Sequence, residues 1–171
     1  MAAYSKKVCL LGEFAVGKTS LVRRFVYNRF DEKYLSTIGV KVSRKTVSVP
    51  RGQEMDELNM LLWDLAGGER FSQMWDHYLR GATGAMLVCD LTRADTLDSL
   101  QKYVDYLLAI VPEAQIVIAA NKVDRVDDHQ LTEHDVEDFA KHLNTSYHLT
   151  SAREGNEVDS AFRELGRKLL A

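Results

Sequence analysis

The chain has 171 residues, of which 46% are hydrophobic and 27% are charged. Its 22 lysines and arginines stand against 25 aspartates and glutamates, and the resulting net charge of −3 excludes the basic surface of a general nucleic-acid-binding protein. No apolar run approaches the roughly 20 residues that span a bilayer, and we expect no signal peptide at the start of the chain. Cys9 and Cys89 lie in apolar runs and are too few for a disulfide framework, so we expect a cytoplasmic protein.

Extended apolar runs alternate with helical patterns along the chain. In chain order the patterns predict a strand at 7–11, a helix at 19–27, strands at 46–49, 58–63 and 84–90, a helix at 96–111, a strand at 115–121, a helix at 132–143, a strand at 147–149 and a helix at 158–170. The runs at 84–90 and 115–121 are apolar throughout, which is typical of parallel strands buried on both faces. We therefore expect a single α/β domain over residues 1–171, with a mostly parallel six-stranded sheet and helices on both faces.

The segment Gly12-Glu-Phe-Ala-Val-Gly17-Lys18-Thr19 joins the first predicted strand to the first helix and has the spacing of a phosphate-binding loop. Gly17 lets backbone amides turn toward phosphate oxygens, and the helix N-terminus adds its dipole. Lys18 is expected to reach the β- and γ-phosphates, and the Thr19 hydroxyl to bind magnesium. The alternative, a glycine turn with a solvated lysine, does not require the flanking strand and helix. Adenine and guanine nucleotides both use this loop.

The segment Asn121-Lys-Val-Asp124 follows the apolar run at 115–121, at a strand end where open α/β sheets bind ligands. The Asp124 carboxylate can accept two hydrogen bonds from guanine N1 and N2, which adenine cannot donate. Lys122 is expected to pack its aliphatic stem on the base, and the Ala152 amide, after the last strand, to bind guanine O6. Taken alone, this segment is only a polar turn. With the phosphate-binding loop upstream, it predicts guanine recognition.

Three further segments complete a resemblance to a known family. Residues 63–71 (Trp-Asp-Leu-Ala-Gly-Gly-Glu-Arg-Phe), 78–82 (Tyr-Leu-Arg-Gly-Ala) and 35–39 (Leu-Ser-Thr-Ile-Gly) resemble the second switch, the Rab segment after it and the first switch of Ras-superfamily small GTPases. From about residue 6 to 170 the chain is similar to that superfamily, and within it to the Rab branch. The resemblance implies the P-loop GTPase fold, GTP or GDP with Mg²⁺ as cofactors, and a GTP-binding molecular switch.

The resemblance also implies roles for single residues. Thr37 would complete magnesium coordination and contact the γ-phosphate, and Asp64 would reach the metal through water. Gly67 would offer its amide to the γ-phosphate, Phe30 would pack edge-on against guanine, and Tyr34 would close over the phosphates. Three sets of site residues are therefore expected. The residues expected to bind the metal are Thr19, Thr37 and Asp64, and those expected to act in catalysis are Lys18, Thr37, Gly67 and Gly68. The residues expected to bind the nucleotide are Gly12, Glu13, Phe14, Ala15, Val16, Gly17, Lys18, Thr19, Ser20, Phe30, Tyr34, Thr37, Gly67, Asn121, Lys122, Asp124, Ser151 and Ala152.

The second switch departs from the family pattern at one position that matters for catalysis. Gly68 stands where the family has the glutamine that orients the attacking water, and a glycine has no side chain for that role. We therefore expect slow GTP hydrolysis. Three alternatives remain: Gln73 or Glu69 replaces the glutamine, a partner supplies it, or the protein is a GTP-gated binding scaffold with negligible hydrolysis. An adenine-specific P-loop kinase is disfavoured by Asp124.

The family also implies partners. Effector, exchange-factor and GTPase-activating proteins would bind through residues near 34–42 and 65–80, where Met74 and Trp75 suggest a nucleotide-dependent surface. Phe14 would either crowd the γ-phosphate or pack outward against a switch. The sequence shows no cysteine near its end, so we expect no direct membrane anchor in this chain; bacterial Ras-like GTPases share that feature, and the origin stays open.

Two polar regions are interpreted as solvated surface. Residues 49–58 are a few residues longer than is usual between the switches and carry Glu54, Asp56 and Glu57, which predicts an acidic hairpin tip. Arg23, Arg24 and Arg29 cluster near the end of the first predicted helix and are expected to lie on its solvated face.

Overall fold

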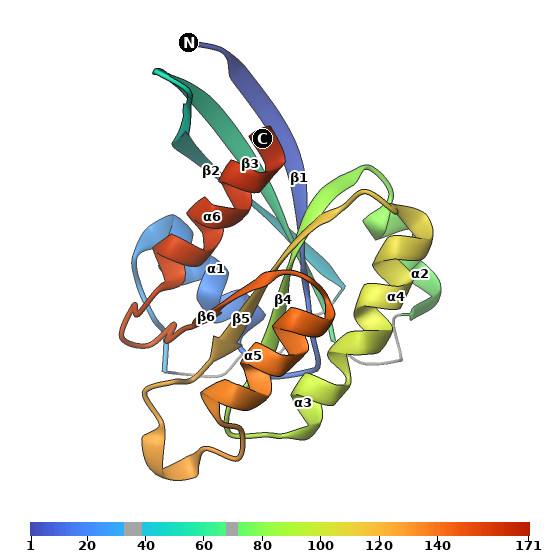
Figure 1. Cartoon of the computed structure of the whole chain (residues 1–171), viewed down its shortest axis with the longest axis vertical. Coiled ribbons are helices and arrows are strands. Elements are labelled where there is room, and N and C mark those ends of the chain that lie inside the picture. Colours follow the sequence, from blue (N-terminus) through green and yellow to red (C-terminus); the bar gives the residue numbers. More distant parts are fainter. Residues whose placement is uncertain (33–38, 68–71) are drawn as a thin grey trace.

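A computed structural model describes residues 1–32, 39–67 and 72–171 (Figure 1). Its sheet has the strand order β2-β3-β1-β4-β5-β6. Only the β2–β3 pair is antiparallel among these neighbours, and the remaining pairs are parallel. The strands are β1 (Ala3–Leu11), β2 (Val40–Arg51), β3 (Glu54–Leu65), β4 (Ala82–Asp90), β5 (Gln115–Asn121) and β6 (Ser146–Leu149). The helices are α1 (Lys18–Tyr27), α2 (Ser72–Leu79), α3 (Asp95–Asp98), α4 (Leu100–Ile110), the short 3₁₀ turn η2 (Val126–Asp128), α5 (Glu133–His142) and α6 (Val158–Leu170).

Helices cover both faces of the sheet (Figure 1). Alternate side chains of β1 enter opposite cores, with Val8 and Leu10 on one face and Cys9 and Leu11 on the other, as the two-residue period of a strand requires. The core on the first side is completed by α1 and α6, whose Phe25 and Phe162 rings stack with centroids 4.3 Å apart. The core on the second side is completed by α2, α4 and α5. The predicted three-layer α/β fold with a mostly parallel sheet is therefore confirmed.

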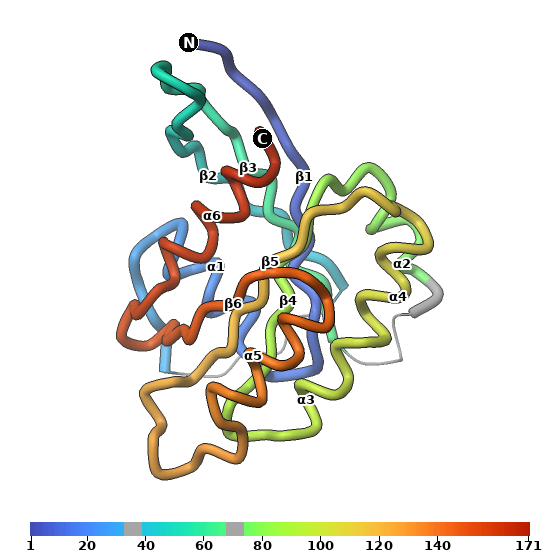
Figure 2. Tube along the Cα trace, in the orientation of Figure 1, coloured from blue at the N-terminus to red at the C-terminus, as the bar shows by residue number. Residues whose placement is uncertain are grey.

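The parallel arrangement brings several chain segments to one edge of the sheet. β1 ends at Leu11 and β5 at Asn121, and both strands point the same way because each is parallel to β4. β6 is parallel to β5 and ends at Leu149, next to the loop that follows it. The Cα trace shows these strand ends converging on one side of the molecule (Figure 2). The phosphate-loop, Asn121 and Ala152 segments therefore lie at the same edge, where open α/β sheets bind ligands.

The tip between β2 and β3 is exposed to solvent, as the sequence predicts, and Asp56 is the one residue of the predicted acidic stretch 54–57 that is buried. Both strands continue to a tight turn at Gly52, whose φ of 64° is in the left-handed region. The Asp56 side chain is buried, and its oxygens accept hydrogen bonds from the Ala2 amide at 3.0 Å and from Arg51 Nη1 at 3.3 Å. These contacts, the Ala2 amide above all, lower the pKa of Asp56. The N-terminus of the chain extends β1 alongside β3, and this long-range pairing buries a residue that local polarity placed in solvent.

Trp75 also differs from its prediction as part of a partner surface. Its side chain is only 2% exposed and packs against Tyr103 and Tyr106 of α4, with ring centroids 4.7 and 5.4 Å apart. Its neighbour Met74 is 50% exposed. Because consecutive residues of a helix point in different directions, α2 inserts Trp75 into the core and leaves Met74 at the surface.

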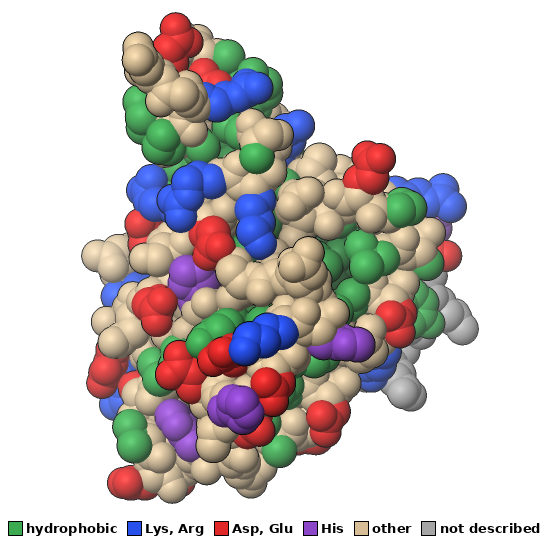
Figure 3. All heavy atoms as spheres, in the orientation of Figure 1, with side chains coloured by type: hydrophobic (Ala, Val, Ile, Leu, Met, Phe, Trp, Pro, Cys, Tyr) green, Lys and Arg blue, Asp and Glu red, His purple; other side chains and the backbone are tan. Residues whose placement is uncertain are grey.

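The surface mixes charges of both signs. Lysine and arginine side chains are interspersed with aspartate and glutamate over the face drawn in Figure 3. Within the described part of the chain, no helix is both long and apolar enough to cross a membrane.

The packing of α2 predicts unequal effects of two neighbouring substitutions. Trp75→Ala removes a buried aromatic side chain and leaves a cavity, so we expect the free energy of unfolding to fall by about 3–5 kcal/mol. Met74→Ala, at the exposed neighbouring position, is the matched control and is expected to change it by about 0.5 kcal/mol or less. Urea denaturation of both variants measures the difference. Equal losses would contradict the burial of Trp75.

Candidate functional site

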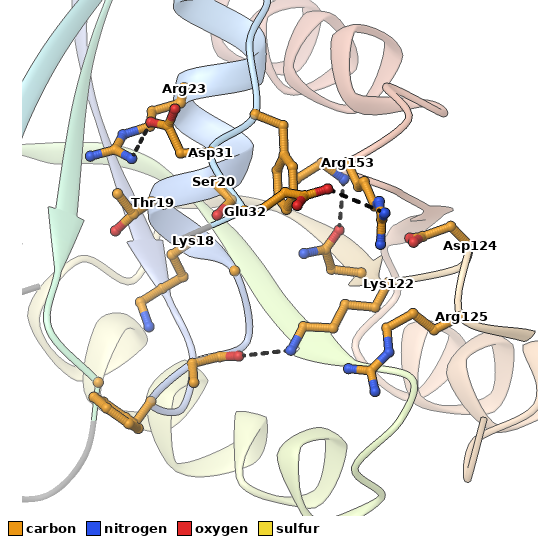
Figure 4. Close-up of a pocket in the computed structure, with 17 residues that line it drawn as sticks. Lys18, Thr19, Ser20, Arg23, Asp31, Glu32, Lys122, Asp124, Arg125 and Arg153 are labelled. Atoms are coloured by element: carbon orange, nitrogen blue, oxygen red, sulfur yellow. Dashed lines mark hydrogen bonds and ion pairs between the residues drawn. The ribbon is translucent and has the colours of Figure 1, made fainter. Parts of the chain in front are cut away.

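A cavity of about 620 Å³ opens at the edge of the sheet where β1, β5 and β6 end (Figure 4). Its walls come from the loop before α1, the start of α1, the segment after α1 and the loops that follow β5 and β6. The residues that line it are Phe14, Ala15, Gly17, Lys18, Thr19, Ser20, Arg23, Phe30, Asp31, Glu32, Gly67, Asn121, Lys122, Asp124, Arg125, Ala152 and Arg153. This volume is in the range of sites for small-molecule ligands and cofactors.

Lys18 forms the floor of one end of the cavity. Its Nζ donates to the backbone carbonyls of Gly12 at 2.9 Å and Glu13 at 3.0 Å, and its side chain is buried. Burial lowers the pKa of Lys18 to about 8, although the charges of the Asp64 and Glu13 carboxylates oppose that shift. A buried cation at the N-terminus of α1 makes this end of the cavity suited to an anion, since the helix dipole and the first amides point the same way.

Glycines allow the loop to pack this closely. A Cβ atom on Gly17, whose φ is 105°, would lie 2.2 Å from Asn121 Nδ2, and one on Gly12 would lie 2.3 Å from the Val88 carbonyl oxygen. A Cβ atom on Gly67 would lie 2.5 Å from the Glu13 carbonyl carbon and the Phe14 nitrogen. The segment after β3 therefore begins directly against the phosphate-binding loop, and any side chain at these positions would push the backbones apart.

Two oxygen groups meet beside Lys18. The Thr19 hydroxyl donates a hydrogen bond to Asp64 Oδ2, and Asp64 is buried at the end of β3. Burial raises the pKa of Asp64, against the opposing effects of the Thr19 hydrogen bond and the Lys18 charge. Within the described residues, Asp64 Oδ1 is buried without a hydrogen-bond partner. A hydroxyl and a carboxylate next to a phosphate-binding loop fit a hard cation such as Mg²⁺, which prefers oxygen ligands.

Asn121 connects the two ends of the cavity. Its buried side chain donates from Nδ2 to the Val16 carbonyl at 3.0 Å. Its Oδ1 accepts from the Ala152 amide at 3.3 Å and from Thr150 Oγ1 at 3.2 Å. One amide side chain thus joins the phosphate-binding loop to β5 and to the loop after β6.

Lys122 and Asp124 form the opposite end of the cavity. Lys122 has a φ of 69° and its Nζ donates to the Ala15 carbonyl at 3.1 Å and pairs with buried Asp90 at 2.8 Å. Asp124 Oδ1 accepts from Ser151 Oγ at 2.8 Å. These contacts hold an extended lysine stem and an oriented carboxylate on the same wall as Ala152, a set of groups that can recognise a flat heterocycle with adjacent donors and an acceptor.

The predicted site residues fall into three groups. Most of the predicted nucleotide-binding residues line the cavity, namely Phe14, Ala15, Gly17, Lys18, Thr19, Ser20, Phe30, Gly67, Asn121, Lys122, Asp124 and Ala152. Gly12, Glu13, Val16, Ser151 and the predicted metal ligand Asp64 stand behind this lining and support it through the backbone, packing or hydrogen bonds. Tyr34, Thr37 and Gly68 lie outside the described residues, as do Glu69 and most of the first switch.

The Glu13 side chain turns away from the cavity. Its carboxylate pairs with Lys102 Nζ at 3.0 Å and accepts from the Tyr103 hydroxyl at 3.2 Å, both on α4. Burial raises the pKa of Glu13, but the hydrogen bonds and charge of Lys102 and Tyr103 outweigh it, so the pKa lies below its usual value. Glu13 can therefore offer a ligand only its backbone, while its side chain ties the loop to α4.

Sequence reasoning missed a second set of residues around the cavity. Arg23 pairs with Asp31 at 2.8 Å and Arg153 with Glu32 at 3.4 Å, and these pairs flank the opening in Figure 4. Arg24, predicted on a solvated helix face, instead donates to backbone carbonyls of the loop after β6. No local motif identifies these residues, because each partner lies on a distant segment of the chain or beyond the helix.

Comparison with known proteins agrees with this geometry. A sequence model of the Ras family matches residues 7–171. The chain is 37% identical to "Ras-related protein Rab-22A" of Homo sapiens over 171 residues, covering 99% of the chain and 86% of that protein. It is 36% identical over 170 residues to "Ras-related protein Rab-31" of Rattus norvegicus, covering 99% of the chain and 85% of that protein. It is also 32% identical over 162 residues to "GTP-binding protein ypt4" of Schizosaccharomyces pombe, covering 93% of the chain and 69% of that protein.

The chain therefore belongs to the Ras family. Within that family it is a Rab-like, GTP-binding regulatory GTPase, a class that binds GTP or GDP together with Mg²⁺.

The close packing at Gly17 predicts that a side chain at this position weakens nucleotide binding. In Gly17→Ala the added Cβ collides with Asn121, so we expect nucleotide affinity to fall by at least about 100-fold, or about 2.7 kcal/mol. Gly52→Ala is the matched control, because Gly52 also has a positive φ but no described atom within 4 Å of its added Cβ. That control is expected to cost about 1–2 kcal/mol of stability and to leave nucleotide affinity unchanged. Titration with a fluorescent GDP analogue measures both, and comparable binding by the two variants would contradict the role of this contact.

Proposed function

We propose that residues 1–171 form one guanine-nucleotide-binding domain that acts as a molecular switch and hydrolyses GTP slowly. The observation that carries this proposal is the continuous cavity that runs from Lys18 to Asp124 and Ala152, joined by Asn121. One end suits a phosphate chain and the other suits a purine base. The separation of these two functions along one cavity is what a nucleoside diphosphate or triphosphate requires.

Guanine is the base that the far end fits. The Asp124 carboxylate can accept hydrogen bonds from guanine N1 and N2, and the Ala152 amide can donate to O6. Adenine carries an amino group, a donor, at its 6-position and has no hydrogen at N1. It would therefore leave the Ala152 amide and the Asp124 carboxylate without hydrogen-bond partners. Mismatches of this kind cost factors of thousands or more in discrimination. Lys122 and Phe30 are proposed to pack against the base, and Ser151 to orient Asp124.

The phosphate end has the parts needed to hold a charged chain. Lys18 would bind the β- and γ-phosphates, and the backbone from Gly12 to Ser20 would surround them, with Gly17 allowing its tight turn. Thr19, Asp64 and Thr37 would hold Mg²⁺, which neutralises charge that develops on the phosphate oxygens. Gly67 is close enough to the phosphate-binding loop to offer its amide to the γ-phosphate. Tyr34 would close over the phosphates.

We propose slow hydrolysis because Gly68 has no side chain to orient the attacking water. Lys18, Thr37 and Gly67 would still position the phosphates, so the site is expected to be weak in catalysis rather than in binding. Contacts of Thr37 and Gly67 with the γ-phosphate would hold the two switches and be lost on hydrolysis. Residues near 34–42 and 65–80 would then present a nucleotide-dependent surface to effectors, exchange factors and GTPase-activating proteins.

Base selectivity tests the binding part of this proposal. We expect GDP to displace a fluorescent GDP analogue at concentrations thousands of times lower than ADP. In Asp124→Asn the side-chain amide can donate to the 2-oxo group of xanthine, so this variant is expected to bind XDP in preference to GDP. Equal competition by ADP and GDP on the unmodified protein would refute guanine recognition.

Single-turnover hydrolysis tests the catalytic part. Gly68→Gln restores a water-orienting side chain, and we expect it to raise the hydrolysis rate several-fold, to about three to ten times the starting rate. The assay follows phosphate release from preloaded GTP, with retention of GTP as the control for dissociation. A starting rate equal to that of glutamine-bearing relatives would contradict slow hydrolysis. Retained GTP with no turnover in either protein would favour the alternative, a GTP-gated binding scaffold.

A further inference from the structure

Arg24 occupies the last turn of α1, on the side of the helix that faces the loop after β6. Its Nε donates to the Ala152 carbonyl at 2.8 Å, and its Nη2 donates to the Arg153 carbonyl at 2.5 Å. Its Nη1 donates to Asn28 Oδ1 at 3.3 Å. One guanidinium group therefore binds two consecutive carbonyls of a loop that is 128 residues away in the chain.

The loop that Arg24 holds is the one that carries the Ala152 amide. That amide donates to Asn121 Oδ1 at 3.3 Å, while the carbonyl of the same residue accepts from Arg24. The two sides of Ala152 are thus fixed by different elements, the amide by the end of β5 and the carbonyl by α1. The preceding residue, Ser151, bonds Asp124, and its own backbone is held by local bonds with Gly155 and Asn156 rather than by Arg24.

Besides the Arg153–Glu32 ion pair at the cavity opening, the loop has local backbone hydrogen bonds. The Ser151 amide donates to the Asn156 carbonyl at 3.1 Å, and the Gly155 amide donates to the Ser151 carbonyl at 2.7 Å. These bonds shape the turn but do not place it relative to the phosphate-binding loop. Arg24 does place it, because α1 carries Lys18 and Thr19 in its first turn and Arg24, which binds the base loop, in its last turn.

We propose that Arg24 is a positioning residue for guanine recognition, which fixes the Ala152 amide where guanine O6 is bound. This inference rests on the proposed function, since it concerns the same base site. The planar guanidinium is required because its fixed fork of donors reaches two carbonyls at once, which a lysine ammonium on a flexible stem does not reproduce. Without Arg24 the loop keeps its sequence and its turn but gains freedom, and the preorganised position of the amide is lost.

The test compares bases that keep or lack the O6 contact. Arg24→Gln is expected to raise the dissociation constant for GDP about tenfold. It is expected to have the same effect on IDP, which keeps O6 but lacks the 2-amino group. The diphosphate of 2-aminopurine riboside lacks O6, so its weaker binding is expected to stay unchanged. Competition against a fluorescent GDP analogue measures all three ligands on each variant.

Two further variants separate positioning from charge and from folding. Arg29→Gln removes the same charge from an exposed arginine that does not line the cavity, and it is expected to leave all three affinities unchanged. Arg24→Lys keeps the charge, so a loss of affinity for GDP and IDP but not for the 2-aminopurine nucleotide supports the fork geometry. This variant remains measurable if Arg24→Gln unfolds. Thermal unfolding of each variant checks its folding.

The outcomes are distinguishable. An equal loss for GDP, IDP and the 2-aminopurine nucleotide would overturn the inference and assign Arg24 a general electrostatic role. Full GDP affinity in Arg24→Lys would overturn it as well. If the unmodified protein fails to bind GDP in preference to ADP, the proposed function itself fails, independently of Arg24.

Discussion

The cavity depends on one buried amide side chain, that of Asn121. Its donor and its acceptor join the Val16 carbonyl in the phosphate-binding loop to Thr150 and Ala152 after β6. These three segments are far apart in the chain, and no short-range interaction brings them together. Because a buried amide must satisfy both its donor and its acceptor, the hydrogen bonds that stabilise Asn121 also determine the distance between the phosphate end and the base end of the cavity.

Two lysines stabilise the part of the site that surrounds Asn121. Lys18 is buried beneath the phosphate-binding loop, and Lys122 forms an ion pair with Asp90, whose side chain is fully buried. Buried charges are costly unless they are paired and hydrogen-bonded. Lys18 donates to two loop carbonyls and Lys122 donates to a third, at Ala15, so both cations hold the loop in its folded shape. The electrostatics of the protein's own side chains thus support the loop conformation that an anion would need.

The two helical layers contribute differently to this arrangement. On one side, α1 extends from the phosphate end to Arg24 and is held to α6 by the stacked rings of Phe25 and Phe162. On the other side, α4 receives the Glu13 carboxylate through Lys102 and Tyr103, and the buried Trp75 of α2 packs on the same tyrosine. The phosphate-binding loop is therefore supported from both faces of the sheet, and a segment with little secondary structure of its own gains rigidity from its neighbours.

The sequence by itself determined the layered α/β fold, through the alternation of apolar runs and helical patterns along the chain. It also predicts the phosphate-binding loop and the base segment, because each is a short stretch of consecutive residues. The apolar run at 115–121 predicts a buried strand, and the polar segment that begins at its last residue, Asn121, predicts a site at the end of that strand. Only the tertiary structure decided that Trp75 and Asp56 are buried and that Arg24 binds a distant loop. Their partners, Tyr103, Ala2 and Ala152, lie on other elements. Whether a polar or aromatic side chain on one element meets such a partner depends on the rotation and register of whole elements, which short-range patterns do not specify.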